Sequence, residues 1–294
     1  MLKKDDNPLI TIFMPTHNRV GLLKRAVRSV LAQSYTNFEL IIVNDGSSDG
    51  TRTYLDELAD LDPRIKSIHI PEARGPSHAR NCAIQLATGE FITDLDDDDE
   101  ILPNRLHTFL DYWDREYAFI TSSILWDFGA SRKLVGGETI NLKISDLLSH
   151  KYDCIHFFTR RSHYLQAGLF DEAMQNSEDR DMGVRLALLG LPIKQISEAN
   201  YIIHTAHDSP RLSHDPRKAE GLISFIAKHE HLMTPKNKKD LDVRLAIYQS
   251  RLLSLPELMS SITSDTTWIY LKFVVDKMFP SGAQKLRNMI RRLR

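Results

Sequence analysis

Cysteine is scarce in this chain, and long hydrophobic runs are absent. The 294 residues include two cysteines, Cys82 and Cys154, which provide neither a disulfide framework nor the spacing of a zinc finger. No stretch approaches the roughly 18 consecutive apolar residues that cross a bilayer, so we expect no transmembrane helix. Residues 1–8 lack the apolar core of a signal peptide. These features together predict a cytoplasmic protein.

A strong net charge and two common phosphate-binding motifs are also missing. The formal net charge is −1 at pH 7, so no overall positive field recruits nucleic acid. No G-x-G-x-x-G follows the first predicted strand, and no G-x-x-x-x-G-K-[S/T] occurs. The dinucleotide fingerprint and the P-loop are therefore excluded. A phosphate bound by this chain would need another source of positive charge, such as a metal ion.

The most informative feature that is present is a run of four aspartates. Asp96 to Asp99 follow the apolar segment Phe91 to Leu95 and precede Pro103, where a helix is predicted to begin. Four adjacent carboxylates repel one another and destabilise the fold unless a cation balances them. Hard divalent cations bind oxygen ligands and also phosphates, which favours Mg²⁺ or Mn²⁺ with a diphosphate. The alternative is an acidic loop that is merely solvated.

Strands and helices are predicted to alternate through the first hundred residues. Continuous β-branched and apolar runs predict buried strands, and apolar residues at helical spacing predict helices. The predicted order is strand 9–14, helix 22–31, strand 38–43, helix 51–59, strand 65–70, helix 78–87 and strand 91–95. This α/β alternation predicts a mostly parallel, Rossmann-like sheet flanked by helices.

Polar residues follow three of these strands at their carboxyl ends. They are Pro15 to Asn18, Asn44 to Ser47 and the aspartate run. Ligands of parallel α/β sheets bind at the carboxyl ends of the strands. We therefore expect these three segments to lie along one edge of the sheet and to form the binding site.

The second half of the chain is less regular. Its predicted elements are a helix at 103–113, a strand at 117–125, a hairpin or connection at 126–140, a strand at 155–159, helices at 162–167 and 182–189, and separate short strands at 192 and at 200–204. From about residue 215 only helical periodicity remains. We therefore predict one α/β domain at 1–214, with halves at 8–100 and 101–214, and a helical extension at 215–294.

The last predicted helix, Trp268 to Phe279, is apolar and is followed by basic residues. These are Lys285, Arg287, Arg291, Arg292 and Arg294. Such a segment can lie on an anionic membrane surface. It can equally pack on the domain with a solvated basic end, and the sequence leaves both interpretations open.

Several short segments, taken in order, resemble family-2 glycosyltransferases. They are Pro15 to Arg19, Gln33 to Glu39, Asn44 to Thr51, Arg74 to Asn81, the aspartate run with Leu102 and Pro103, and Gly168 to Glu172 followed by Glu178 and Asp179. The resemblance covers roughly residues 8–210 and is specific because the pieces keep the family's order and spacing. It implies a GT-A fold, a nucleotide-diphosphate-sugar donor, a divalent cation and inversion at the anomeric carbon.

The resemblance assigns nucleotide binding to the first half of the chain. Asp45 is expected to read uracil, since a carboxylate can accept a hydrogen bond from the imide N–H of that base; its alternative role is a helix cap. The residues expected beside it, with the histidine ring against the base, are Pro15, Thr16 and His17. Arg74 and Arg80 are expected to reach the ribose or the phosphates, or else to be surface ion-pair residues.

The resemblance also assigns Mn²⁺ or Mg²⁺ to the aspartate run, where the family has an Asp-x-Asp pattern. Asp98 is the predicted direct ligand, and Asp96 is a second candidate. Asp97 or Asp96 is predicted near the ribose. Asp99 is a candidate N-cap for the following helix.

A histidine often completes the metal site in this family, after the last core strand. His207 is the predicted ligand here, and His204 is the less favoured choice. Ser209 to Ser213 are expected to form a lid over the bound donor.

Asp179 is the predicted general base. Inverting transfer needs one carboxylate to take the proton of the acceptor hydroxyl, and the resemblance places this base in the pair Glu178–Asp179. Glu178 is expected to contact the acceptor. Asp181 is a rival base by position, and all these acids could instead complement the dipole of the helix that they begin.

The leading hypothesis is an inverting transferase that moves a sugar, from a UDP-sugar, to a hydroxyl of a glycan or lipid-linked acceptor in surface-polysaccharide assembly. It would act in the cytoplasm, with peripheral contact to the inner face of the membrane through the basic C-terminal helix. One alternative is a non-catalytic nucleotide-sugar-binding protein of the same fold. A second alternative is a sugar-phosphate nucleotidyltransferase, but that class would need a glycine-rich basic loop after the first strand, which this sequence does not supply. A phospho-acceptor receiver domain would leave Glu178 and Asp179 unexplained.

Overall fold

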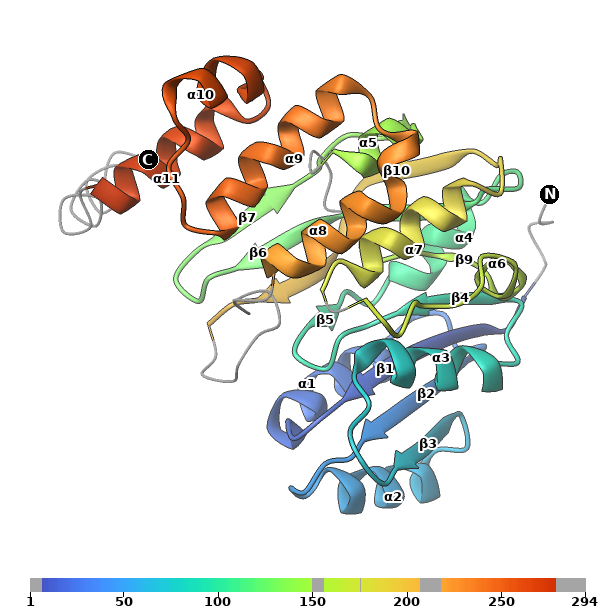
Figure 1. Cartoon of the computed structure of the whole chain (residues 1–294). Coiled ribbons are helices and arrows are strands. Elements are labelled where there is room, and N and C mark those ends of the chain that lie inside the picture. The colour runs from blue at the N-terminus through green and yellow to red at the C-terminus, as the bar shows by residue number, and fades with distance from the viewer. Residues whose placement is uncertain (1–6, 150–155, 175, 207–217, 279–294) are drawn as a thin grey trace.

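The computed structural model describes residues 7–149, 156–174, 176–206 and 218–278. The elements in chain order are β1 Ile10–Thr16, α1 Val20–Leu31, β2 Phe38–Asp45, α2 Thr51–Leu61, β3 Ile65–Ile70, α3 Pro76–Leu86, β4 Phe91–Asp94, β5 Glu100–Ile101, α4 Arg105–Tyr112, β6 Phe119–Asp127, β7 Arg132–Val135, β8 Ile140–Leu142, α5 Ile144–Leu148, β9 Thr159–Arg160, α6 Arg161–Gln166, α7 Glu178–Ala187, β10 Ile193–His204, α8 Lys218–His229, η2 Glu230–Leu232, α9 Pro235–Tyr248, α10 Leu255–Ser261 and α11 Thr267–Met278. They form two neighbouring sheets flanked by helices (Figure 1).

The first sheet has the strand order β3-β2-β1-β4-β9. Its first four strands are parallel, and only β9 runs antiparallel, on β4. This arrangement confirms the predicted alternation of strands and helices in the first hundred residues. Because parallel strands end at the same edge, the segments that follow β1, β2 and β4 come together there.

Strand β1 is mostly apolar because both of its faces are buried. Ile12 and Met14 pack into one hydrophobic cluster together with Leu23 and Val27 of α1. Phe13 points to the other face, into the cluster that contains residues of α3, α7 and α8. A strand covered on both sides gains burial from every residue, so its sequence shows no alternation.

The second sheet has the order β5-β10-β6-β7, and β8 also pairs with β10. A bridge between Ile120 and Phe158 links β6 to the segment just before β9. The predicted hairpin at 126–140 corresponds to the antiparallel pair β6–β7. The prediction of two short strands at 192 and 200–204 is wrong, since β10 is one strand. Its pairing with β6 shifts register between Ile196 and Ala199, which accommodates the polar interruption as a bulge.

From residue 218 onward, helices are the only regular elements of the described chain, as the periodicity predicts. Leu222 and Phe225 of α8 share a buried cluster with Met182 and Val184 of α7, whereas α10 and α11 lie at the end of the molecule away from β3 and α2 (Figure 1). The proposed boundary at 214/215 falls outside the described residues. Within the described ranges, no helix is long and apolar enough to cross a membrane.

A buried carboxylate ties β2 to its neighbours. Glu39 accepts hydrogen bonds from the hydroxyl of Thr11 (2.6 Å), the backbone N–H of Thr88 (2.6 Å) and the Lys66 ammonium (2.7 Å). Burial by itself raises the pKa of this group, but the hydrogen bonds from Lys66, Thr11 and Thr88 outweigh burial and lower the pKa to about 2. The ionised form of Glu39 therefore stabilises the fold.

We predict that Glu39→Gln lowers the free energy of unfolding at pH 7 by about 1–3 kcal/mol, because hydrogen bonds to the ionised carboxylate are replaced by weaker ones to a neutral amide. A carboxyl whose pKa is lower in the folded protein than in the unfolded chain stabilises the fold at pH values above the unfolded pKa. This stabilisation is lost as the pH falls toward the folded pKa, so the loss of stability in the variant should be smaller at pH 3.5. Urea unfolding at both pH values measures it. The exposed Glu57→Gln of α2 is the control and should change stability by less than about 0.5 kcal/mol. An equal deficit at both pH values would contradict the ionic origin.

Candidate active site

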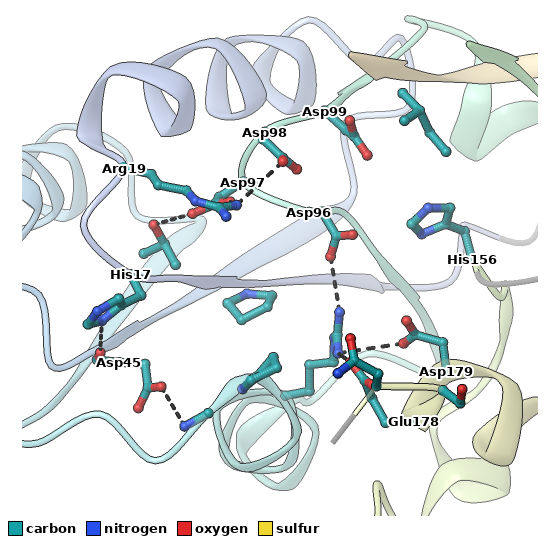
Figure 2. A pocket seen from close by; sticks show the side chains of 18 of the residues that line it. His17, Arg19, Asp45, Asp96, Asp97, Asp98, Asp99, His156, Glu178 and Asp179 are labelled. Carbon is teal, nitrogen blue, oxygen red and sulfur yellow. Dashed lines mark hydrogen bonds and ion pairs between the residues drawn. The ribbon is translucent and has the colours of Figure 1, made fainter. Parts of the chain in front are cut away.

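A cavity of about 670 Å³ lies at the carboxyl ends of β1, β2 and β4, opposite the start of α7 (Figure 2). The residues predicted for the site that line it are Pro15, Thr16, His17, Asp45, Arg80, Asp96, Asp97, Asp98, Glu178 and Asp179. The three polar strand ends therefore meet, as the strand order predicts. The role of each residue stays a prediction.

His17 connects the ends of β1 and β2. Its Nδ1 lies 2.5 Å from the carbonyl oxygen of Asp45, and its Nε2 lies 2.9 Å from the side-chain amide of Asn18. A carbonyl oxygen only accepts, so this network assigns the proton to Nδ1 and leaves Nε2 as the acceptor. The ring is thus held at the edge of the cavity (Figure 2).

Asp45 joins two loops across the same edge. Its carboxylate accepts the backbone N–H groups of Arg74 (2.8 Å) and Gly75 (2.7 Å). It does not cap α2, because Asp49 accepts the N–H of Thr51 instead. The turn after Asp45 needs glycine: Gly46 has φ +66°, and a Cβ there would lie 2.4 Å from the nitrogen of Ala73.

Arg19 balances two of the four aspartates, a role that sequence reasoning did not assign to it. Its guanidinium lies 3.1 Å from the carboxylate of Asp97 and 3.4 Å from that of Asp98. Asp97 also accepts a hydrogen bond from the hydroxyl of Thr16, at 2.7 Å. Burial raises the pKa of Asp97 to about 6, although Arg19 and Thr16 oppose the shift.

Asp99 faces β10. Its carboxylate accepts the hydroxyl of Tyr201 (3.2 Å) and the backbone N–H of His204 (3.0 Å). The prediction that Asp99 caps the next helix is wrong, because β5 intervenes and α4 begins at Arg105 with Asn104 in the N-cap position.

Arg80 of α3 holds three acidic side chains together. It is buried, and its terminal nitrogens lie 3.2 Å from Asp96, 3.1 Å from Glu178 and 3.5 Å from Asp179. The guanidinium also lies over the ring of Phe170, 5.4 Å from its centroid. These contacts join the loop after β4 to the start of α7. A contact of Arg80 with ribose or phosphate stays a prediction.

Asp179 sits in the first turn of α7, with its side chain 26% exposed. Its pKa is raised above the ordinary aspartate value, chiefly by burial and further by repulsion from Glu178 and Asp96, whereas Arg80 opposes the shift. Asn176 and Ser177, just before the helix, both have φ +66°. A non-glycine residue in this region is uncommon, so the approach to the acidic pair is conformationally constrained.

Asp181, the rival candidate for the general base, is held by ion pairs in the protein interior. It is fully buried and lies 2.7 Å from Arg185, 3.0 Å from Lys228 and 2.8 Å from His229. Burial raises its pKa, but the hydrogen bonds from His229 and Arg185 outweigh burial and lower the pKa to about 2. It is not among the residues that line the cavity.

Two other predicted residues, Arg74 and His204, do not line the cavity. The half-exposed side chain of Arg74 does not line the cavity and pairs with Glu172 at 3.4 Å. His204 lies 2.9 Å from Glu100. His207 and the expected lid, Ser209 to Ser213, lie outside the described residues.

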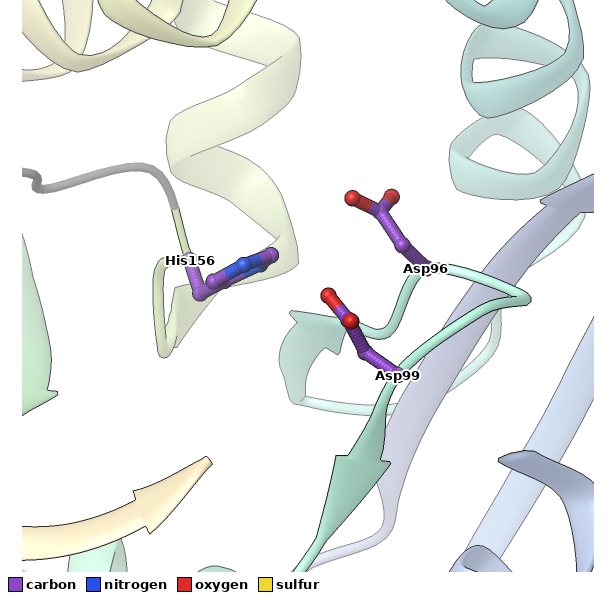
Figure 3. Close-up of side chains that lie close together, drawn as sticks. All are labelled: Asp96, Asp99 and His156. Carbon is purple, nitrogen blue, oxygen red and sulfur yellow. The ribbon is translucent and has the colours of Figure 1, made fainter. Parts of the chain in front are cut away.

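His156 is a cavity residue that sequence reasoning missed. It is 3% exposed, and its Nδ1 lies 2.5 Å from a carboxylate oxygen of Asp94. Potential metal-binding atoms of His156, Asp96 and Asp99 lie within 4.8 Å of one another (Figure 3). The sequence places His156 in a strand-like segment, but no periodicity reveals that this segment runs beside β4. Two oxygen donors and one nitrogen donor suit a divalent cation.

The chain belongs to glycosyl transferase family 2, whose model matches residues 11–174. It is therefore a glycosyltransferase. It is 35% identical over 246 residues to WcaA of Escherichia coli (strain K12), a protein provisionally named a colanic acid biosynthesis glycosyl transferase. That match covers 80% of this chain and 86% of the relative.

Two solved structures share the fold. TarS of S. aureus, in complex with UDP-GlcNAc, matches with a TM-score of 0.64 and 17% identity over 91% of this chain and 80% of that chain. The mannosyltransferase PcManGT from Pyrobaculum calidifontis, in complex with GDP-Man and Mn²⁺, matches with a TM-score of 0.59 and 18% identity over 94% and 89%. The predicted GT-A fold is confirmed.

We predict that Arg80→Ala, measured without metal, destabilises the protein by about 3–5 kcal/mol, because it leaves buried carboxylates without their cation. Loss of Arg80 removes the cation that opposes the raised pKa of Asp179, so this carboxyl holds its proton more tightly in the folded protein than in the unfolded chain. Stability should then fall as pH rises, so the deficit should be larger at pH 8 than at pH 5. Thermal and urea unfolding at both pH values measure it.

The matched control is Arg74→Ala, which removes an arginine six positions earlier whose partner is exposed. It should cost less than about 1 kcal/mol at either pH. If the deficit of Arg80→Ala matched that of the control, the carboxylates would not depend on Arg80.

Proposed function

We propose that this glycosyltransferase inverts the anomeric centre and moves a sugar from a UDP-sugar to a hydroxyl of a glycan or lipid-linked acceptor in surface-polysaccharide assembly. The observation that carries the proposal is the pair Glu178–Asp179, which faces the aspartate loop across one cavity with Arg80 between them. The name of WcaA supports a role in polysaccharide assembly.

The nucleotide is proposed to bind where β1 and β2 end. Each carboxylate oxygen of Asp45 accepts one backbone N–H, and each has a second lone pair for a further donor such as the imide N–H of uracil. His17 is proposed to lie against the base, with Pro15 and Thr16 beside it. The UDP-GlcNAc in TarS supports a UDP-sugar, and the GDP-Man in PcManGT makes a GDP-sugar the competing choice.

Asp179 is proposed as the general base. It takes the proton of the acceptor hydroxyl while that oxygen bonds to the anomeric carbon, and the bond from this carbon to the diphosphate breaks on the opposite face. A raised pKa brings the base nearer to the operating pH and makes it a better proton acceptor. Glu178 is proposed to orient the acceptor.

The residues around Asp96 fit a divalent cation, Mn²⁺ or Mg²⁺. Carboxylates supply the hard oxygen ligands that both ions prefer, and the Mn²⁺ in PcManGT supports the choice of manganese. When bound, such an ion would stabilise the charge of the leaving diphosphate. Asp97 or Asp96 is proposed to lie near the ribose, and Asp97 is positioned by Thr16 and Arg19.

The experiment measures the release of nucleoside diphosphate from UDP-, GDP-, dTDP- and CMP-sugars with Mn²⁺ and candidate acceptors. We expect turnover with a UDP-sugar and an inverted product. Asp179→Asn should keep donor binding within about threefold and lose about 10²–10⁴ in turnover, the usual contribution of a general base. Glu172→Gln, an exposed acid outside the cavity lining, is the control and should leave turnover unchanged.

Three results would contradict these assignments. A retained anomeric configuration would refute inversion. Full turnover by Asp179→Asn would refute the base. A preference for another nucleotide, above all GDP, would refute the proposed contact between Asp45 and uracil.

Peripheral membrane contact on the cytoplasmic side is proposed for the two last described helices. Apolar side chains stand exposed there, among them Met259 of α10 at 82% and Trp268 of α11 at 80%. The sequence after residue 278 adds five basic residues. Exposed apolar residues followed in the sequence by basic ones suit an anionic lipid surface, from which a lipid-linked acceptor could be reached.

We predict that the full chain cosediments with vesicles that contain phosphatidylglycerol and less with pure phosphatidylcholine. Trp268→Ser together with Met259→Ser should weaken binding at least about tenfold, since two inserted side chains are lost. Leu61→Ser is the control, because Leu61 is also 82% exposed but lies at the end of α2. Equal binding by the double variant would refute the contact.

A further inference from the structure

We propose that Asp96, Asp99 and the Nε2 atom of His156 are the protein ligands of the divalent cation, and that Asp94 orients His156 for this role. The inference deepens the proposed nucleotide-sugar transfer, on which it rests. It assigns a metal ligand that the Asp-x-Asp pattern does not contain, and it replaces Asp98 with Asp99.

The first argument is the state of the His156 imidazole. The ring is buried, its Nδ1 lies 2.5 Å from Asp94 Oδ2, and within the described part of the chain Nε2 has no hydrogen-bond partner. A buried polar atom without a partner costs about 1–3 kcal/mol. A carboxylate at Nδ1 places the proton there and leaves the lone pair of Nε2 available, the usual arrangement of a histidine that binds a metal.

The second argument is where the ring lies. Figure 3 shows the imidazole extending from one side of the cavity toward the carboxylates of Asp96 and Asp99 on the other. The possible ligand atoms of the three residues lie within 4.8 Å of one another. Two ligand atoms that bind one ion at about 2.1–2.2 Å are at most about 4.4 Å apart, so shifts of a few tenths of an ångström bring all three within reach of one ion.

Tyr201 of β10 contacts all three proposed ligands. Its ring stacks on His156 with centroids 3.7 Å apart, and its hydroxyl donates to the Asp99 carboxylate at 3.2 Å. The same hydroxyl accepts a hydrogen bond from the backbone N–H of Asp96, at 3.2 Å. One fully buried side chain thus positions residues from two segments, the aspartate run and the segment before β9, which is the role that outer-shell partners play in metal sites.

Asp98 and His204, which the resemblance offers as ligands, are not part of this cluster of ligand atoms. Asp98 forms an ion pair with Arg19, and its backbone carbonyl accepts a hydrogen bond from Arg25. His204 pairs with Glu100. A nitrogen ligand also has a consequence for selectivity, because imidazole suits transition metals whereas Mg²⁺ favours oxygen ligands. We therefore expect Mn²⁺ to bind more tightly than Mg²⁺.

The test detects a nitrogen ligand directly. Mn²⁺ is added to the full chain, alone and with UDP, and electron spin-echo envelope modulation is recorded. We expect coupling to ¹⁴N in the wild type, altered by ¹⁵N-histidine labelling and lost in His156→Gln. His204→Gln and His207→Gln are the matched controls and should keep the coupling. The wild-type spectra do not depend on the folding of any variant.

Affinity for Mn²⁺ alone, measured by titration calorimetry, separates the ligand sets. Asp99→Asn and His156→Gln should each weaken binding at least about tenfold, and Asp94→Asn about 10–100-fold as an outer-shell change. Asp98→Asn should change binding by less than about threefold, and Tyr201→Phe tests the positioning hydroxyl. Circular dichroism confirms that each variant is folded.

Several outcomes would overturn the proposal. They are bound Mn²⁺ without ¹⁴N coupling, coupling lost in His207→Gln but kept in His156→Gln, and binding abolished by Asp98→Asn alone. Turnover of a UDP-sugar distinguishes failure of the proposed ligand set from failure of the proposed transferase function. Turnover without nitrogen coupling would refute the ligand set only, and coupling without turnover of any nucleotide-sugar would refute the function only.

Discussion

The ion pairs of Arg80 are the interaction on which the candidate active site depends. One buried guanidinium reaches Asp96 after β4 and the Glu178–Asp179 pair at the start of α7, although Glu178 lies 98 positions along the chain. Acids so close together would repel one another without this cation. A planar fork of donors can serve several carboxylates at once, which a lysine ammonium does less well. Removal of a buried partner leaves an unbalanced charge, so the network requires all its members.

The cavity around this network is built by both sheets and by the C-terminal helices. Its floor is the carboxyl edge of β1, β2 and β4, where backbone N–H groups and side chains converge. Lys218 of α8 and Tyr248 of α9 also line it. The region expected as a helical extension therefore contributes to the site.

Sequence reasoning succeeded where one segment carries its own signal. Apolar runs predicted β1 and β2 because strands buried on both faces show no alternation, and the polar residues after them lie on the cavity as a parallel sheet requires. It failed for β10, where a bulge kept one strand continuous through a polar interruption. It also failed for Asp99, which bonds to Tyr201 of a distant strand rather than to the next helix.

The sequence by itself determined the α/β alternation, the acidic run and the family, since each is written in consecutive residues. Only the tertiary structure decided which carboxylates share a cation. Arg19 pairs with Asp97 and Asp98, whereas Asp99 turns toward His156 and Tyr201. Four identical residues in a row cannot be told apart by pattern. Their neighbours come from strands and helices as far as 105 positions away along the chain. Packing alone brings those neighbours within the few ångströms at which charges, hydrogen bonds and metal ligands act.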